Sequence, residues 1–225
     1  MRVLVVTHGR EMANGWLDDA LAEVGAEYEI VDPSRGDDLP VSDYDKVIVL
    51  GGHMGAYDQE LHPWLTTEKA FIKRRIADET PLLGVCLGAQ LIAEVGGGRA
   101  YRADHTEAGM VTIQPTRAGR TDPVLSAIEG PVVAWHHDTF ELPSGAELLG
   151  VTDDYPHAFR YGRAFGVQFH PEVTPDMFRT WASMAGPEEL KTAGLDPDHF
   201  AEGLDADADR LRRQAVAFFR TWLEE

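Results

Sequence analysis

The chain contains, at positions 81–90, the segment Pro81-Leu82-Leu83-Gly84-Val85-Cys86-Leu87-Gly88-Ala89-Gln90. An apolar run typical of a buried strand leads straight into Gly-x-Cys-x-Gly, and helical spacing follows over 87–95. Glycines on both sides of the cysteine permit a sharp strand-to-helix turn that a Cβ would obstruct. The same turn exposes the serine of Gly-x-Ser-x-Gly hydrolases. We therefore expect Cys86, the only cysteine in the chain, to be a nucleophile, with its thiolate favoured by the positive end of the helix.

Working outward from this turn, strand-like runs alternate with helical patterns through the first half of the chain. Strands are predicted at 3–6, 28–31, 46–50 and 81–85, and helices at 14–24, 61–76 and 87–95. This alternation predicts an α/β fold with a mostly parallel central sheet and helices on both faces. Short β-type runs at 111–114, 132–135, 147–151 and 164–169 predict a small antiparallel extension.

The C-terminal part changes composition but shows no convincing domain boundary. Residues 186–209 are rich in Asp, Glu, Gly and Pro, which indicates an acidic loop or a short helical insertion. Helical spacing returns at 207–223, where we expect a C-terminal helix packed on the domain. We therefore predict a single domain over residues 1–225.

Composition narrows the classes of function. The net charge of −18 and pI near 4.8 repel phosphate backbones and argue against nucleic-acid binding. No apolar stretch approaches the about 18 residues of a membrane helix, and the N-terminal apolar run is too short for a signal peptide. One cysteine excludes an internal disulfide. These features predict a soluble cytoplasmic protein that binds neither nucleic acid nor membrane.

A cysteine nucleophile needs a base, and the segment Gly166-Val167-Gln168-Phe169-His170-Pro171-Glu172 supplies one. His170 and Glu172 are two residues apart, so in an extended chain their side chains point to the same side. Glu172 then orients one imidazole nitrogen while the other faces Cys86. A lone His-Pro-Glu on a surface would mean little, and the interpretation rests on the combination of the two segments.

Two further segments are weighed on their residues alone. Gly51-Gly52 follows the strand predicted at 46–50, where free backbone N–H groups could meet an oxyanion, although paired glycines after a strand usually form only a turn. The run His136-His137-Asp138 lacks the spacing of a metal site and is interpreted as the wall of a substrate pocket, with a structural role close behind. Residues 104–107, with Asp104, His105 and Glu107, are expected to form a solvated loop.

Taken in this order, these segments resemble the class I (triad) glutamine amidotransferases, over most of the chain to about residue 181. The similarity is specific at residues 84–90 and at His170-Pro171-Glu172. Residues 52–58 and 135–140 look like those of the stand-alone, GMP-synthase-like members. Two departures stand out: His53 occupies a position where relatives usually have Pro, and His157 one where they often carry Gln.

The resemblance implies a flavodoxin-like sheet and hydrolysis of glutamine to glutamate and ammonia through a γ-glutamyl thioester on Cys86. It implies that His170 and Glu172 complete the triad and that the N–H groups of Gly52 and Leu87 form the oxyanion hole. Gln90 matches a position that helps to hold glutamine. His137 and Asp138 join it as predicted substrate-binding residues.

No metal or organic cofactor is expected for this half-reaction. The chain shows no ATP-binding loop, so ammonia is expected to pass to a separate synthetase or acceptor subunit. Two alternatives stay open. The same triad serves a γ-glutamyl peptidase or hydrolase, and a protein that keeps the fold without activity would act as an interaction partner.

Overall fold

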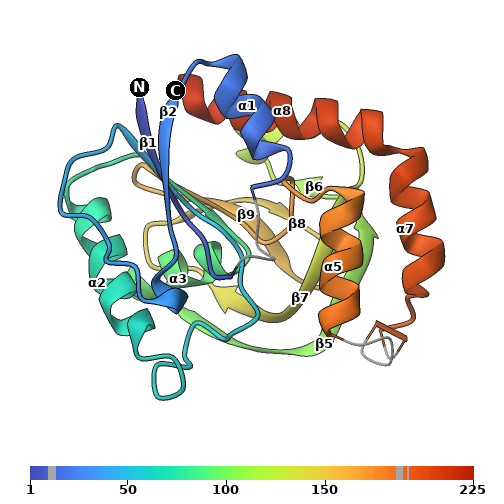
Figure 1. The fold of residues 1–225 in the computed structure, drawn as a ribbon, viewed down its shortest axis with the longest axis horizontal. Helices are drawn as coiled ribbons and strands as arrows, with labels where there is room; N and C mark the ends of the chain where they lie inside the picture. Colours follow the sequence, from blue (N-terminus) through green and yellow to red (C-terminus); the bar gives the residue numbers. More distant parts are fainter. Residues whose placement is uncertain (10–13, 186–189, 192) are drawn as a thin grey trace.

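The computed structural model describes residues 1–9, 14–185, 190–191 and 193–225. Its central sheet has the strand order β2-β1-β3-β4-β10-β9-β8-β6 (Figure 1). The first five strands in that order pair in parallel, and their bounds are Glu27–Val31, Arg2–Val6, Lys46–Val49, Leu82–Val85 and Ala164–Val167. An order of 2-1-3-4-5 with parallel pairing defines the flavodoxin-like arrangement. The predicted fold class is therefore confirmed.

The predicted antiparallel extension is also present, on one side of this parallel sheet. Strands β9 (Pro156–Tyr161), β8 (Glu147–Val151) and β6 (Gln114–Pro115) continue the sheet beyond β10 by antiparallel pairing. Between β6 and β7 lie a 3-10 turn, η2 (Gly119–Thr121), and the short helix α4 (Pro123–Ser126).

Helices cover both faces of the sheet (Figure 1). One face packs against α1 (Leu17–Glu23) and α8 (Ala208–Glu224), and the other against α2 (Trp64–Ala77) and α3 (Leu87–Val95). A second 3-10 turn, η1 (Pro33–Arg35), follows β2. The central strands are largely apolar because both faces are buried. In β1, for example, Val3 and Val5 lie in one core cluster, whereas Leu4 and Val6 lie in the other.

A separate two-stranded ribbon pairs β5 (Arg99–Val111) with β7 (Val132–Glu141) in antiparallel register. The register shifts between Arg102 and Glu107. Two expectations are wrong here. The short strands predicted at 111–114 and 132–135 belong to a much longer ribbon, and the loop predicted at 104–107 lies within β5. A polar strand of a two-stranded ribbon has an exposed side, so its composition resembles that of a loop.

The C-terminal helices build a third apolar cluster beside the ribbon. Helices α5 (Pro175–Ala185) and α7 (Pro197–Ala206) contribute Met177, Phe178, Trp181, Ala201 and Leu204 to it. Helix α7 lies within the acidic region 186–209, of which residues 186–189 and 192 fall outside the described part. None of the helices in the described ranges has both the length and the apolar character required to cross a bilayer.

Candidate active site

Cys86 lies at the junction of β4 and α3, at the carboxyl end of the parallel sheet. Its backbone has a φ of 51°, which is uncommon outside glycine. The flanking glycines explain how this turn fits. A Cβ on Gly88 would lie 2.1 Å from the carbonyl oxygen of Val49 in β3, and one on Gly84 would lie 2.5 Å from the backbone of Gly88. The glycines thus let the helix start against the sheet, which presents Cys86 at the predicted elbow.

His170 and Glu172 meet as their spacing predicts. Nδ1 of His170 lies 2.8 Å from Oε1 of Glu172, and both side chains are buried. Burial would lower the pKa of His170, but the charges of Glu172 and of the Cys86 thiolate, with hydrogen bonds to both, raise it to about 10. The imidazole is therefore held protonated at neutral pH, and an adjacent imidazolium favours the reactive thiolate.

The loop after β3 closes over this pair. A Cβ on Gly51 would lie 3.0 Å from Cε1 of His170 and 3.6 Å from Cβ of Cys86, so only a glycine leaves this approach open. A Cβ on Gly52 would lie 2.7 Å from the Leu87 side chain. Leu87 is the first residue of α3, and the first N–H groups of a helix have no carbonyl partner within it. The two predicted oxyanion donors are thus neighbours beside Cys86.

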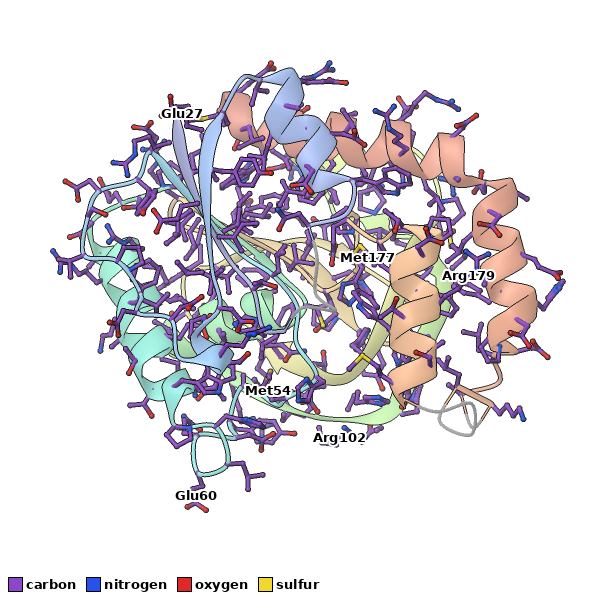
Figure 2. The ribbon with its side chains drawn as sticks, in the orientation of Figure 1. Glu27, Met54, Glu60, Arg102, Met177 and Arg179 are labelled. Carbon is purple, nitrogen blue, oxygen red and sulfur yellow. The ribbon has the colours of Figure 1, made fainter. Side chains whose placement is uncertain are left out.

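A cavity of about 490 Å³ opens at this point, within the range of small-molecule sites. Cys86, His170, Gly52 and the predicted substrate-binding residues all line it; the latter are Gln90, His137 and Asp138. Glu172 and Leu87 are not part of the lining set. Figure 2 shows Met54 and Arg102, two further lining residues, on the same side of the ribbon. The site thus draws residues from the β3 loop, the elbow, the β5–β7 ribbon and the start of the C-terminal region.

The predicted substrate-binding residues also contact one another. Nε2 of Gln90 donates to the carbonyl oxygen of Asp138 at 3.1 Å. The Asp138 carboxylate accepts a hydrogen bond from the Tyr57 hydroxyl at 3.1 Å and lies 3.7 Å from the Arg102 guanidinium. Burial and the charge of Asp138 raise the pKa of Tyr57 to about 12, so the phenol remains a donor at neutral pH. Nδ1 of His137 lies 2.7 Å from the Thr106 hydroxyl.

Sequence reasoning missed Gln168, which contacts the sulfur. Its Nε2 donates to Sγ of Cys86 at 3.4 Å, and its Oε1 accepts from Gln90 at 3.3 Å. The signal was present in the alternation of the chain. Gln168 lies two residues before His170, as Glu172 lies two residues after it, and all three side chains face the site.

His8 and Glu68 form a second buried pair that was not predicted. Nε2 of His8 lies 3.0 Å from Oε1 of Glu68, and neither side chain is exposed. Nδ1 of His8 lies 2.9 Å from the carbonyl oxygen of Gly51. Burial would lower the pKa of His8, but the charge of Glu68 and hydrogen bonds to Glu68 and Gly51 raise it. The pair therefore anchors the loop that carries Gly51 and Gly52.

Comparison with known proteins places this geometry among relatives. The model of the family "Glutamine amidotransferase class-I" matches residues 11–181. The glutamine-hydrolysing GMP synthase of Thermus thermophilus is 36% identical over 142 residues, which cover 58% of this chain and 27% of that protein. A separate glutamine-hydrolysing GMP synthase subunit from Sulfurisphaera tokodaii is 27% identical over 179 residues, which cover 77% of this chain and 90% of the relative.

The solved structures agree in fold. A glutamine amidotransferase from Thermotoga maritima superposes with a TM-score of 0.88 at 30% identity, covering 100% of this chain and 99% of that one. The matched region spans only about a quarter of the length of the Thermus GMP synthase, 27%. Because the family model matches most of the chain and is consistent with the elbow, the loop and the cavity, the chain belongs to the class I glutamine amidotransferase family.

Proposed function

We propose that this protein hydrolyses the side-chain amide of glutamine to glutamate and ammonia at Cys86. The observation that carries the proposal is the arrangement of Cys86 on a positive-φ turn, beside a buried His170 that is paired with Glu172. A protonated imidazole beside a sulfur provides both an activated nucleophile and a proton donor for an amine leaving group.

The reaction runs in two steps. Sγ of Cys86 attacks the side-chain carbonyl carbon, and the oxyanion that forms accepts hydrogen bonds from the N–H groups of Gly52 and Leu87. The C–N bond breaks as His170 gives its proton to the departing nitrogen, which leaves ammonia and a γ-glutamyl thioester. His170 then takes a proton from water, water attacks the thioester, and the C–S bond breaks to release glutamate. Glu172 holds the imidazole in the orientation that both steps need.

The rim of the cavity carries charges that suit the α-substituents of an amino acid. The Asp138 carboxylate fits an α-ammonium group, and the Arg102 guanidinium, 3.7 Å from it, fits an α-carboxylate. Gln90 and His137 complete the wall around the substrate. We propose that the ammonia passes to an acceptor enzyme in trans, in line with the resemblance to a separate GMP synthase subunit.

The test is release of ammonia and glutamate from glutamine by the purified protein. Wild type should turn over glutamine, and Cys86→Ala and His170→Gln should lose at least about 1000-fold in kcat/KM. Equal activity in the Cys86→Ala protein would reject the proposal. Turnover of a γ-glutamyl dipeptide, measured in parallel, separates a glutaminase from a γ-glutamyl peptidase.

A further inference from the structure

Three side chains from three strands converge on one buried point next to the cavity. Glu107 lies in β5, His136 in β7 and His157 in β9. One ligand atom from each lies within 4.8 Å of the others. The Nε2 atoms of His136 and His157 approach the same carboxylate oxygen, Oε2 of Glu107, at 2.9 and 2.6 Å.

The hydrogen-bond geometry around His136 leaves one position without a proton. Nδ1 of His136 lies 3.0 Å from the carbonyl oxygen of Asp138, which only accepts, so Nδ1 carries the hydrogen. In a neutral imidazole Nε2 is then an acceptor, yet it faces a carboxylate oxygen, which is also an acceptor. A cation between these two atoms resolves the conflict.

We propose that Glu107, His136 and His157 bind a divalent transition-metal ion, with Zn²⁺ as the best-fitting ion. Two imidazole nitrogens and one carboxylate oxygen form a donor set that zinc uses in proteins. This proposal rests on the three side chains and is independent of the proposed function.

The surroundings of the three residues match those of metal ligands. A ligating histidine usually donates its second ring N–H to a carbonyl or carboxylate, as His136 does to Asp138. Ligating carboxylates are hydrogen-bonded in turn, and Oε1 of Glu107 accepts from the Thr152 hydroxyl at 2.9 Å. Both histidine side chains are at most 1% exposed, whereas Glu107 is 12% exposed and offers an entry path.

Binding requires a small rearrangement. Two ligands of a tetrahedral zinc ion lie about 3.3 Å apart when each bond is about 2.0–2.1 Å long. The present separations of 2.9 and 2.6 Å are shorter, so Glu107 must retreat by about half an ångström while water takes the fourth position. Glu107 lies where the register of the β5–β7 ribbon shifts, which leaves its strand room to adjust.

The ion would act on the cavity through His136, which lines it. The Asp138 carbonyl that His136 holds also accepts from Gln90. A metal would therefore fix the orientation of His136 and tie the ribbon to β9. The family resemblance places Gln where this chain has His157, and an amide is a poor zinc ligand, so the site is expected to be a property of this chain.

The experiment uses untagged full-length Cys86→Ala protein, which removes the thiol as a competing ligand. After stripping with a chelator, it is titrated with Zn²⁺ by calorimetry, and with Co²⁺ by its visible absorption. We expect one ion per chain and the intense bands of a tetrahedral Co²⁺ site. The same titrations on His157→Gln and Glu107→Gln should show at least about 100-fold weaker binding.

His105→Gln is the matched control, since His105 is nearby in β5 and its side chain is 56% exposed. It should bind Zn²⁺ like the parent. Circular dichroism and thermal unfolding of the metal-free variants confirm that His157→Gln folds, which its resemblance to the relatives' residue favours. Undiminished binding by His157→Gln and Glu107→Gln would overturn the proposal. Absence of stoichiometric binding by the parent would also overturn it and leave a proton shared between His136 and Glu107.

Discussion

The side-chain amide of Gln168 donates a hydrogen bond to the sulfur of Cys86, with 3.4 Å between Nε2 and Sγ. Both residues are buried, so little water competes for the sulfur. A donor aimed at a thiolate stabilises the charged form, and hydrogen bonds to charged groups are worth about 1.5–3 kcal/mol. Gln168 therefore supplements His170 in preparing the nucleophile.

Replacing this donor should slow the chemistry at the sulfur. We expect Gln168→Leu to lower the rate of Cys86 alkylation by iodoacetamide at pH 7 by about 10-fold or more, because about 1.4 kcal/mol corresponds to a factor of ten. Gln168→Glu, similar in size but negatively charged, should lower it further. Alkylation needs no bound glutamine, so it isolates the sulfur from the contact with Gln90. An unchanged rate in both variants would contradict this role.

The charge state of His170 gives a pH prediction with a definite sign. Its folded-state pKa of about 10 lies above the ordinary value of 6.5. The stabilisation from the charged pair is therefore fully present below pH 6.5 and is lost as the pH rises through about 10. The free energy of unfolding of wild type should exceed that of Glu172→Gln by more at pH 6.5 than at pH 10.

Nuclear magnetic resonance of the ring nitrogens measures the same titration directly. The imidazole of His170 should stay protonated well above pH 7 in wild type and lose its proton at lower pH in both Glu172→Gln and Cys86→Ala. A midpoint near the ordinary value of 6.5 in wild type would contradict the ion-pair description.

Breaking the buried pair of His8 and Glu68 should damage both stability and catalysis. Glu68→Gln leaves His8 without its counter-charge, and removing one partner of a buried pair costs about 3–5 kcal/mol of unfolding free energy. Urea unfolding measures this loss. Since the pKa of His8 is raised above 6.5, the loss should be largest below that pH and shrink as the pH rises through the raised value.

A double variant separates the two roles of this pair. His8→Leu with Glu68→Leu removes both buried charges, so it should recover stability relative to Glu68→Gln. Nothing then donates from position 8 to the carbonyl of Gly51, and kcat should remain low while KM changes little. Recovery of kcat together with stability would show that His8 does not position the loop.

The glycines of the elbow should differ sharply from a glycine elsewhere. Gly88→Ala forces a Cβ to 2.1 Å from a backbone oxygen, so we expect a loss of at least about 3 kcal/mol or failure to fold. Gly203, in α7, has nothing within 4 Å of a built Cβ. Gly203→Ala should therefore stabilise the protein by about 0.5–1 kcal/mol. Chemical unfolding of both variants checks the contrast, and equal stability would refute it.

The elbow was predictable from the sequence because its causes are local. The strand, the paired glycines and the helix start lie within residues 81–95, and the side-chain alternation of an extended chain places His170 beside Glu172. Gln168 obeys the same alternation and could have been included.

The cluster of Glu107, His136 and His157 had no such signal. Its members meet only because β5 pairs with β7, where Glu107 is opposite His136, and because β9 lies beside them. Strand pairing at this distance depends on register, and the polar strand β5 resembled a loop. The buried pair of His8 and Glu68 likewise joins β1's end to α2 across 60 residues.

The positions of the nucleophile, the oxyanion loop and the base follow from one earlier feature, the adjacency of β3, β4 and β10 in the parallel sheet. Each group stands just after its strand ends, so the spacing of neighbouring strands, about 4.8 Å, sets the scale of the site. The reaction machinery is thus built into the backbone lattice, whereas the cavity wall comes from an appended ribbon and C-terminal helices. New substrates or acceptor enzymes could be accommodated by remodelling those appendages, with the chemistry left intact.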